Sequence, residues 1–112
     1  MKIYHNPRCS KSRQGLAIVK DANVDFEIRE YLKEPVSVEE LTDLLRKLDI
    51  PAIELVRKNE KDWKENFKNK NLSEEDVINA MVSFPKLIER PIFVKGNKAV
   101  IGRPPEKIKE LL

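Results

Sequence analysis

Apolar and polar residues follow two different patterns in the first third of the chain. Residues 2–5 have the composition of a short strand, and residues 24–31 alternate between apolar and polar side chains, which predicts a second strand. Between them, residues 10–22 carry apolar side chains in a pattern that favours a helix, and Asn23 ends it. A strand, a helix and a strand in this order predict parallel strands joined by a right-handed crossover.

Only helices are predicted in the middle of the chain. Ser37 begins a capping-box sequence, and leucines follow it at helical spacing, at Leu41, Leu44, Leu45 and Leu48. Ser73 begins a second helix of the same kind, which Pro85 closes. Residues 52–69, between these two helices, are expected to form short helical pieces.

The last part of the chain returns to strands. Residues 92–94 and 99–101 are apolar runs on either side of Gly96-Asn97, which is typical of a hairpin turn. Pro104 and Pro105 then open a last amphipathic helix. The complete order predicts an α/β protein with a thioredoxin-like fold, in which helices flank a mixed sheet. We expect residues 1–112 to form a single domain, with a helical insertion at about residues 37–85.

Composition excludes several classes of protein. The chain has 112 residues, of which 37% are charged and 40% hydrophobic, as in a folded, water-soluble domain. The sequence contains neither an apolar run long enough for a membrane helix nor a secretory leader, so we expect a cytoplasmic protein with no membrane contact. The net charge is +3, but lysines alternate with acidic residues, which indicates a solvated surface rather than nucleic-acid binding.

Cys9 is the most informative residue, because it is the only cysteine and it stands where the first helix begins. Polar and turn-forming neighbours argue against the alternative, a buried structural cysteine. Backbone N–H groups at a helix start lower the pKa of a nearby thiol, so Cys9 is predicted to be reactive. Ser12 either donates its hydroxyl to the thiolate, caps the helix, or is an ordinary serine at the helix N-terminus. One cysteine and one histidine are too few for a metal site.

Three arginines stand beside loop signals: Arg57, Arg90 and Arg103. Each alone is more often a surface cation, but guanidinium groups bind tetrahedral oxyanions through two parallel hydrogen bonds. The peptide bond before Pro91 is expected to be cis, as in thioredoxin-like folds. His5, the only histidine, either tunes the thiolate or makes a hydrogen bond to the turn.

Five motifs in order resemble the arsenate reductase family of the glutaredoxin-coupled, ArsC-like type. They lie at residues 3–13, 31–32, 56–59, 85–92 and 101–106. The resemblance implies that Cys9 is the nucleophile, with His5 and Ser12 as further catalytic residues, and that Arg57, Arg90 and Arg103 bind the substrate oxyanion. The chain differs from the best-studied enzymes at Ser10-Lys11, where they have Gly-Thr.

The resemblance also implies the reaction and its partners. Cys9 attacks arsenate to form a covalent adduct, glutathione attacks next as a co-substrate, arsenite leaves, and glutaredoxin reduces the remaining mixed disulfide. The lone cysteine agrees with this independently, because two electrons are needed and one thiol can form no internal disulfide. We expect no bound cofactor and a monomer.

Two other interpretations remain open at this point. The first is an interaction protein similar to Spx, a thiol-responsive regulator that shares the fold and binds RNA polymerase. Proteins like Spx usually carry Cys-x-x-Cys, whereas this chain has Ser12 at the second position, and Gly102-Arg103-Pro104-Pro105 is a feature of the reductases. The second is an ArsC-like protein that does not reduce arsenate.

Overall fold

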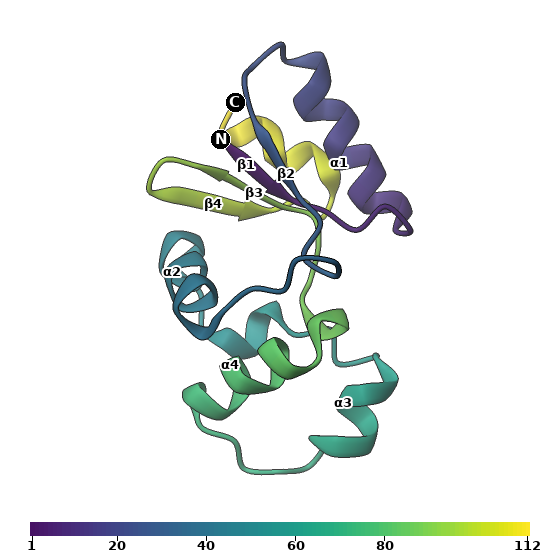
Figure 1. The fold of residues 1–112 in the computed structure, drawn as a ribbon, viewed down its shortest axis with the longest axis vertical. Helices are drawn as coiled ribbons and strands as arrows, with labels where there is room; N and C mark the ends of the chain where they lie inside the picture. The colour runs from purple at the N-terminus through teal and green to yellow at the C-terminus, as the bar shows by residue number, and fades with distance from the viewer. The chain divides into compact units, whose positions relative to one another are not determined.

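The chain folds into two units, which Figure 1 shows in a computed structural model of residues 1–112. The first unit contains residues 1–34 and 90–112, and the second contains residues 35–89. The second unit includes the predicted helical insertion at residues 37–85; that both units make a single domain stays a prediction. None of the helices has the length and hydrophobicity that spanning a membrane requires.

A four-stranded mixed sheet forms the frame of the first unit. Its order is β2-β1-β3-β4, and the strands are β1 (Lys2–Tyr4), β2 (Glu27–Arg29), β3 (Ile92–Lys95) and β4 (Lys98–Ile101). β1 is parallel to β2 and antiparallel to β3, and β3 is antiparallel to β4. The predicted parallel pair and the predicted hairpin are therefore confirmed, and Gly96 has a φ of 61° in the hairpin turn, where glycine is favoured.

β2 is shorter than the alternating pattern of residues 24–31 predicts. Its partner β1 has only three residues, and the ladder runs from Lys2 opposite Glu27 to Tyr4 opposite Arg29. Val24 and Phe26 precede the strand and pack, half-buried, against the core instead. The alternation in this segment thus only partly reports a strand, because Val24 and Phe26 lie before β2, while Ile28 within β2 is exposed.

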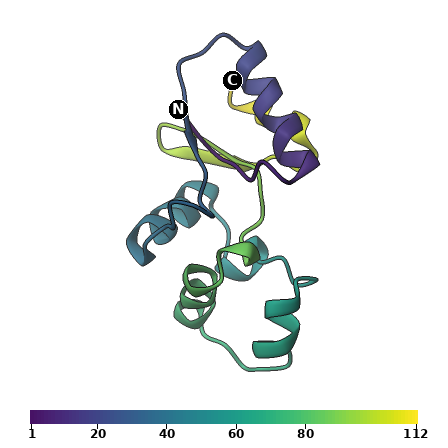
Figure 2. The same cartoon turned by 45° about the vertical axis from the view of Figure 1, so that its right-hand side comes forward.

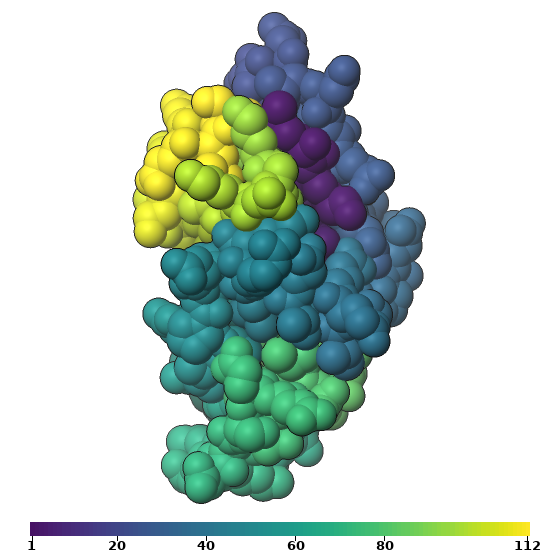
Figure 3. All heavy atoms as spheres, turned by 90° about the vertical axis from the view of Figure 1, so that its left-hand side faces the viewer, coloured from purple at the N-terminus to yellow at the C-terminus, as the bar shows by residue number.

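The core of the first unit lies between the sheet and two helices. Ile3, Val19, Phe93 and Ile108 are fully buried there. Two helical segments, α1 (Ser10–Asp21) and η3 (Pro105–Glu110), pack against each other on one face of the sheet (Figure 2). The space-filling view shows the C-terminal segment beside the β3–β4 hairpin (Figure 3). The helix predicted after Pro104 and Pro105 is present and is of the 3₁₀ type.

Pro91 is enclosed by two glycines and one isoleucine. A Cβ added to Gly15 would lie 2.7 Å from Pro91 Cγ and 2.9 Å from Ile108 Cδ1, and one added to Gly102 would lie 2.9 Å from Pro91 Cγ. The bond between Arg90 and Pro91 is cis, as the sequence predicts, and so is the bond before Pro104. The glycines therefore allow α1 and the loop after β4 to approach the proline ring closely.

A Gly15→Ala variant should be less stable than the wild type, although alanine normally stabilises the interior of a helix by about 1 kcal/mol. The added methyl group would overlap the rigid ring of Pro91, and overpacking of this kind costs about 1–3 kcal/mol. The free energy of unfolding in urea tests this, with Gln14→Ala on the exposed side of α1 as the control. A Gly15→Ala protein as stable as the wild type would contradict the packing.

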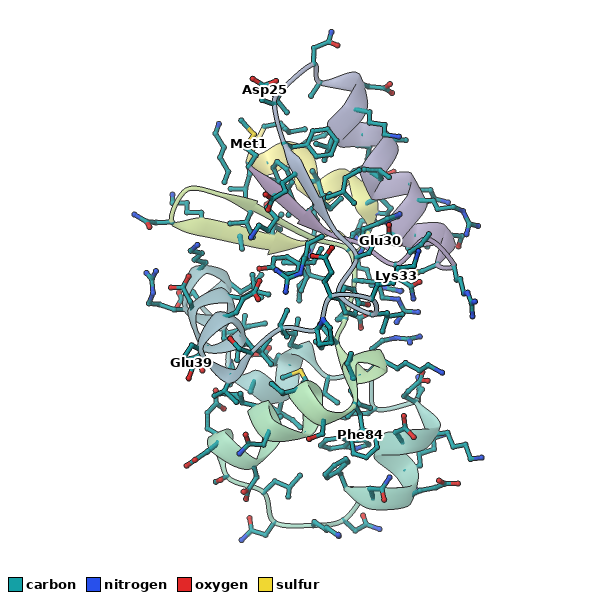
Figure 4. All side chains as sticks on the ribbon, viewed as in Figure 1. Met1, Asp25, Glu30, Lys33, Glu39 and Phe84 are labelled. Atoms are coloured by element: carbon teal, nitrogen blue, oxygen red, sulfur yellow. The ribbon has the colours of Figure 1, made fainter.

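The second unit is helical, as the sequence predicts. It contains α2 (Val38–Leu48), η1 (Ala52–Leu55), α3 (Lys61–Asn66), α4 (Glu74–Ser83) and η2 (Pro85–Leu87). Ser37 and Ser73 cap α2 and α4 by accepting hydrogen bonds from the first helical turn. Phe84, labelled in Figure 4, packs edge-on against Phe67, whose ring also contacts Trp63.

Candidate active site

Cys9 is the N-cap residue of α1, at the end of a short turn that follows β1. Its backbone is extended, with φ −98° and ψ 123°, and its carbonyl oxygen accepts the Arg13 N–H at 3.0 Å. The Cys9 N–H donates to the Asn6 carbonyl at 3.0 Å, and the Asn6 side chain accepts the Arg8 N–H at 3.0 Å. Asn6 therefore closes the turn from both its backbone and its side chain, and the sulfur is held at the start of the helix.

The pKa of the Cys9 thiol lies below its ordinary value. Partial burial alone would raise this pKa, because a thiolate loses hydration there. The backbone N–H of Ser12, the positive charge and a hydrogen bond of Arg90, and the backbone N–H of Lys11 outweigh that effect. The sulfur makes no cap hydrogen bond of ordinary length, so these groups act mainly by attracting the negative charge of the thiolate.

Arg90 and Arg103 both face the sulfur. Arg103 Nη2 lies 3.7 Å from Cys9 Sγ, and Arg103 Nε donates to the Arg90 carbonyl at 3.0 Å, which fixes one arginine to the other. The Arg90 side chain is buried, with 8% of the residue exposed, and its Nε has no hydrogen-bond partner. A buried cation needs a counter-ion, and Arg90 forms no salt bridge, so the Cys9 thiolate is the anion that the structure places against it.

His5 and Ser12 form a buried, hydrogen-bonded pair. His5 Nδ1 lies 2.7 Å from Ser12 Oγ, and the same oxygen accepts the Asn6 N–H at 2.9 Å. Ser12 is the third residue of α1 and is fully buried, so it does not cap the helix. If His5 carries its proton on Nδ1, Ser12 Oγ accepts two hydrogen bonds and its own proton is free for the sulfur.

His5 is uncharged at neutral pH. Burial lowers its pKa most, and the positive charges of Lys20 and Arg13 lower it further, while Glu30 and a hydrogen bond to Ser12 oppose the shift. Glu30 itself pairs with Lys33 Nζ at 3.5 Å, and Figure 4 shows both residues after β2. His5 thus acts as a hydrogen-bond partner rather than as a cation. Its neighbours form no group of three His, Cys, Asp or Glu residues that could hold a metal ion.

Arg57 lies in the second unit and already has two carboxylate partners. Its Nη1 is 3.0 Å from Glu60 Oε2, and its Nε is 3.8 Å from Glu89 Oε1. The Arg57 N–H also donates to the Leu87 carbonyl at 2.7 Å, so the backbone around it is fixed within this unit. The structure brings Cys9, His5, Ser12, Arg90 and Arg103 together in the first unit; that Arg57 joins them stays a prediction.

Asn6 and Arg13 also shape the turn, through contacts that the sequence did not predict. Arg13 Nη1 donates to the Pro7 carbonyl at 2.8 Å, and so ties the turn back to α1. The preference of asparagine for hydrogen bonds to its own backbone two residues on was the available signal for Asn6. No local pattern predicts the Arg13 contact, because it depends on how the helix leaves the turn.

Comparisons with known proteins agree on one family. Residues 4–111 match the family model described as "ArsC family". A protein of Escherichia coli (strain K12) named "Uncharacterized protein YfgD" is 50% identical, over 100% of this chain and 96% of its own length. An "Arsenate reductase" of Haemophilus influenzae is 41% identical, over 98% of this chain and 97% of its own.

A solved structure has nearly the same backbone. The structure described as an arsenate reductase from Vibrio cholerae superposes with a TM-score of 0.94 at 41% identity, over 100% of this chain and 98% of its own. The α/β fold with a mixed sheet flanked by helices, predicted from the order of elements, is therefore confirmed.

Proposed function

The chain belongs to the ArsC family, and we propose from this that it is a thiol-dependent arsenate reductase, which converts arsenate to arsenite. One observation supports the chemistry above all others. The only thiol lies at the start of α1 and has a lowered pKa, and Arg90 and Arg103 both interact with its sulfur. This arrangement suits a nucleophile that must attack an anion, because the cations stabilise both the thiolate and the approaching oxyanion.

In the first step, the Cys9 thiolate forms a bond to the arsenic of arsenate. One arsenate oxygen leaves as water after it takes up protons, and a covalent sulfur–arsenic adduct remains. We propose that Arg90 and Arg103 hold the remaining oxygens, whose negative charge they offset. Arg57 is proposed as the third oxyanion ligand; its Nη1 and Nε lie near Glu60 and Glu89.

The second step needs a thiol from outside the chain. Glutathione is proposed as that thiol: its sulfur bonds to the Cys9 sulfur, the sulfur–arsenic bond breaks, and the electron pair of that bond reduces arsenic from As(V) to As(III). Arsenite leaves, and a mixed disulfide remains on Cys9. Glutaredoxin then attacks this disulfide and restores the Cys9 thiolate, so two thiol electrons balance the two that arsenate gains.

His5 and Ser12 are proposed to prepare the thiolate. Neutral His5 orients the Ser12 hydroxyl through the 2.7 Å contact, and the hydroxyl proton then stabilises negative charge on the sulfur. We further propose that the protein works as a monomer in the cytoplasm, where reduced glutathione and glutaredoxin are available.

Arsenite formation by the purified chain tests the proposal. We expect turnover with arsenate, glutathione and glutaredoxin together, and no more than one equivalent of arsenite per chain when glutaredoxin is omitted. Arsenite is measured directly, with glutathione and glutaredoxin but no chain as the background. Absence of turnover together with a stoichiometric complex with RNA polymerase would favour a regulatory protein instead.

A further inference from the structure

The first turn of α1 has an unusual charge for a helix start. It contains no acidic residue, whereas α2 has Glu39 and Glu40 in its first turn and α4 has Glu74, Glu75 and Asp76. Acidic side chains are favoured at this end of a helix, because the free N–H groups carry positive charge. In α1 the same place holds Lys11, which adds positive charge to an end that is already positive.

Arg8 and Lys11 are exposed, and neither has a carboxylate partner. Some other surface cations do have an acidic side chain within 4 Å, as in Lys2–Glu27, Arg46–Asp43 and Lys61–Glu65. Arg8 immediately precedes Cys9 and Lys11 follows it by two residues, so the thiol stands between two uncompensated charges. No carboxylate of the chain neutralises these two charges, so they can act on a molecule that approaches the sulfur.

A buried group independently marks this place as an anion site. Arg90 is more than nine-tenths buried, acts on the Cys9 sulfur, and has an Nε without a hydrogen-bond partner. In the proposed function, Arg90 binds the small oxyanion next to the sulfur. Arg8 and Lys11 lie outside that buried position, exposed on the surface and within two residues of Cys9 in the sequence.

We propose that Arg8 and Lys11 determine which external thiols and disulfides react with Cys9, by favouring small molecules that carry carboxylates. The two side chains act on the encounter, because exposed charges attract an anionic reactant over roughly one Debye length, about 10 Å. This selectivity rests on the proposed function in one respect, namely that Cys9 exchanges with a thiol from solution.

Thiol–disulfide exchange measures the effect without arsenate. The Cys9 thiolate attacks one sulfur of a small disulfide, a new Cys9–sulfur bond forms, and the other sulfur leaves as a thiolate, so the disulfide is the only oxidant. Two probes differ in charge: dithiobis(nitrobenzoate), which carries carboxylates, and neutral dithiodipyridine. The measured quantity is the rate constant for dithiobis(nitrobenzoate) divided by the rate constant for dithiodipyridine, both at one pH. A change in the thiolate fraction affects both rates equally and leaves this ratio unchanged.

We expect this ratio to fall about tenfold in Lys11→Glu and in Arg8→Glu, which is the lower range of electrostatic steering effects. Lys11→Arg should keep the ratio. Lys98→Glu is the matched control. Lys98 is exposed and stands opposite Lys95 in the β3–β4 ladder, next to the hairpin turn. This is the end of the sheet where β1 begins, away from Cys9. In the wild type, added salt should lower the ratio towards that of the variants.

An unchanged ratio in both Lys11→Glu and Arg8→Glu would overturn the proposal, and so would an equal fall in Lys98→Glu. The salt dependence of the wild type provides a test that needs no variant at all. A chain that reduced no arsenate but showed the expected ratios would refute the proposed function and leave the charge selectivity standing.

Discussion

Cys9→Ser is expected to abolish arsenate reduction, with a loss of activity on the order of a thousandfold or more. A serine hydroxyl has a far higher pKa than a thiol, so the cations that ionise Cys9 cannot ionise the serine. An alkoxide adduct would also fail at the second step, because oxygen cannot form the mixed disulfide that carries the electrons. Arsenite production in the presence of glutathione and glutaredoxin is the measurement.

The loss in Cys9→Ser should come from chemistry and not from unfolding. Residue 9 is the N-cap of α1, and serine is among the favoured N-cap residues, so the helix keeps or improves its cap. Unfolding in urea should give a free energy within about 1 kcal/mol of the wild type. Turnover above background by a folded Cys9→Ser protein would rule out Cys9 as the nucleophile.

Arg90→Gln is expected to lower the rate of arsenate reduction by about a hundredfold, the loss typical when one preorganised donor is removed from a charged transition state. It should also raise the pKa of Cys9, because the positive charge and hydrogen bond of Arg90 help to lower it. Alkylation by iodoacetamide follows the thiolate, so its rate against pH should keep its shape and move to higher pH.

Arg90→Lys separates the two roles of this arginine. Lysine keeps the positive charge but lacks the planar fork that binds two oxygens at once. The alkylation profile should therefore stay closer to the wild type than in Arg90→Gln, while the KM for arsenate rises. If Arg90→Gln left the alkylation midpoint where it is in the wild type, the assignment of Arg90 as a partner of the thiolate would be wrong.

Local sequence predicted the elements whose signals are local. Ser37 and Ser73 begin their helices by capping them, and Gly96 makes the hairpin turn, because each of these residues acts on neighbours within a few positions. The length of β2 was mispredicted because it depends on β1, a partner elsewhere in the chain. The contact of Gly15 with Pro91 could not be predicted for the same reason.

In the candidate site, too, some features follow from local sequence and others depend on contacts between distant residues. That Cys9 begins a helix follows from the turn residues before it, so its reactivity could be inferred locally. His5 and Ser12 were both named, but their mutual contact needs β1 and α1 to be placed on each other. Arg90 and Arg103 were grouped by motif, and no pattern in the sequence shows that one donates to the carbonyl of the other.

Because Cys9 is the N-cap residue of α1, the protein accommodates its sulfur best when that sulfur is a free thiolate. When the sulfur is bound to glutathione in the mixed disulfide it carries no negative charge, and the first turn of α1 and Arg90 lose the thiolate that they attract. The mixed disulfide is therefore less well accommodated than the thiolate that follows it. A sulfur of lowered pKa is also the better leaving group, so the same geometry that starts the reaction drives the enzyme back to its starting state.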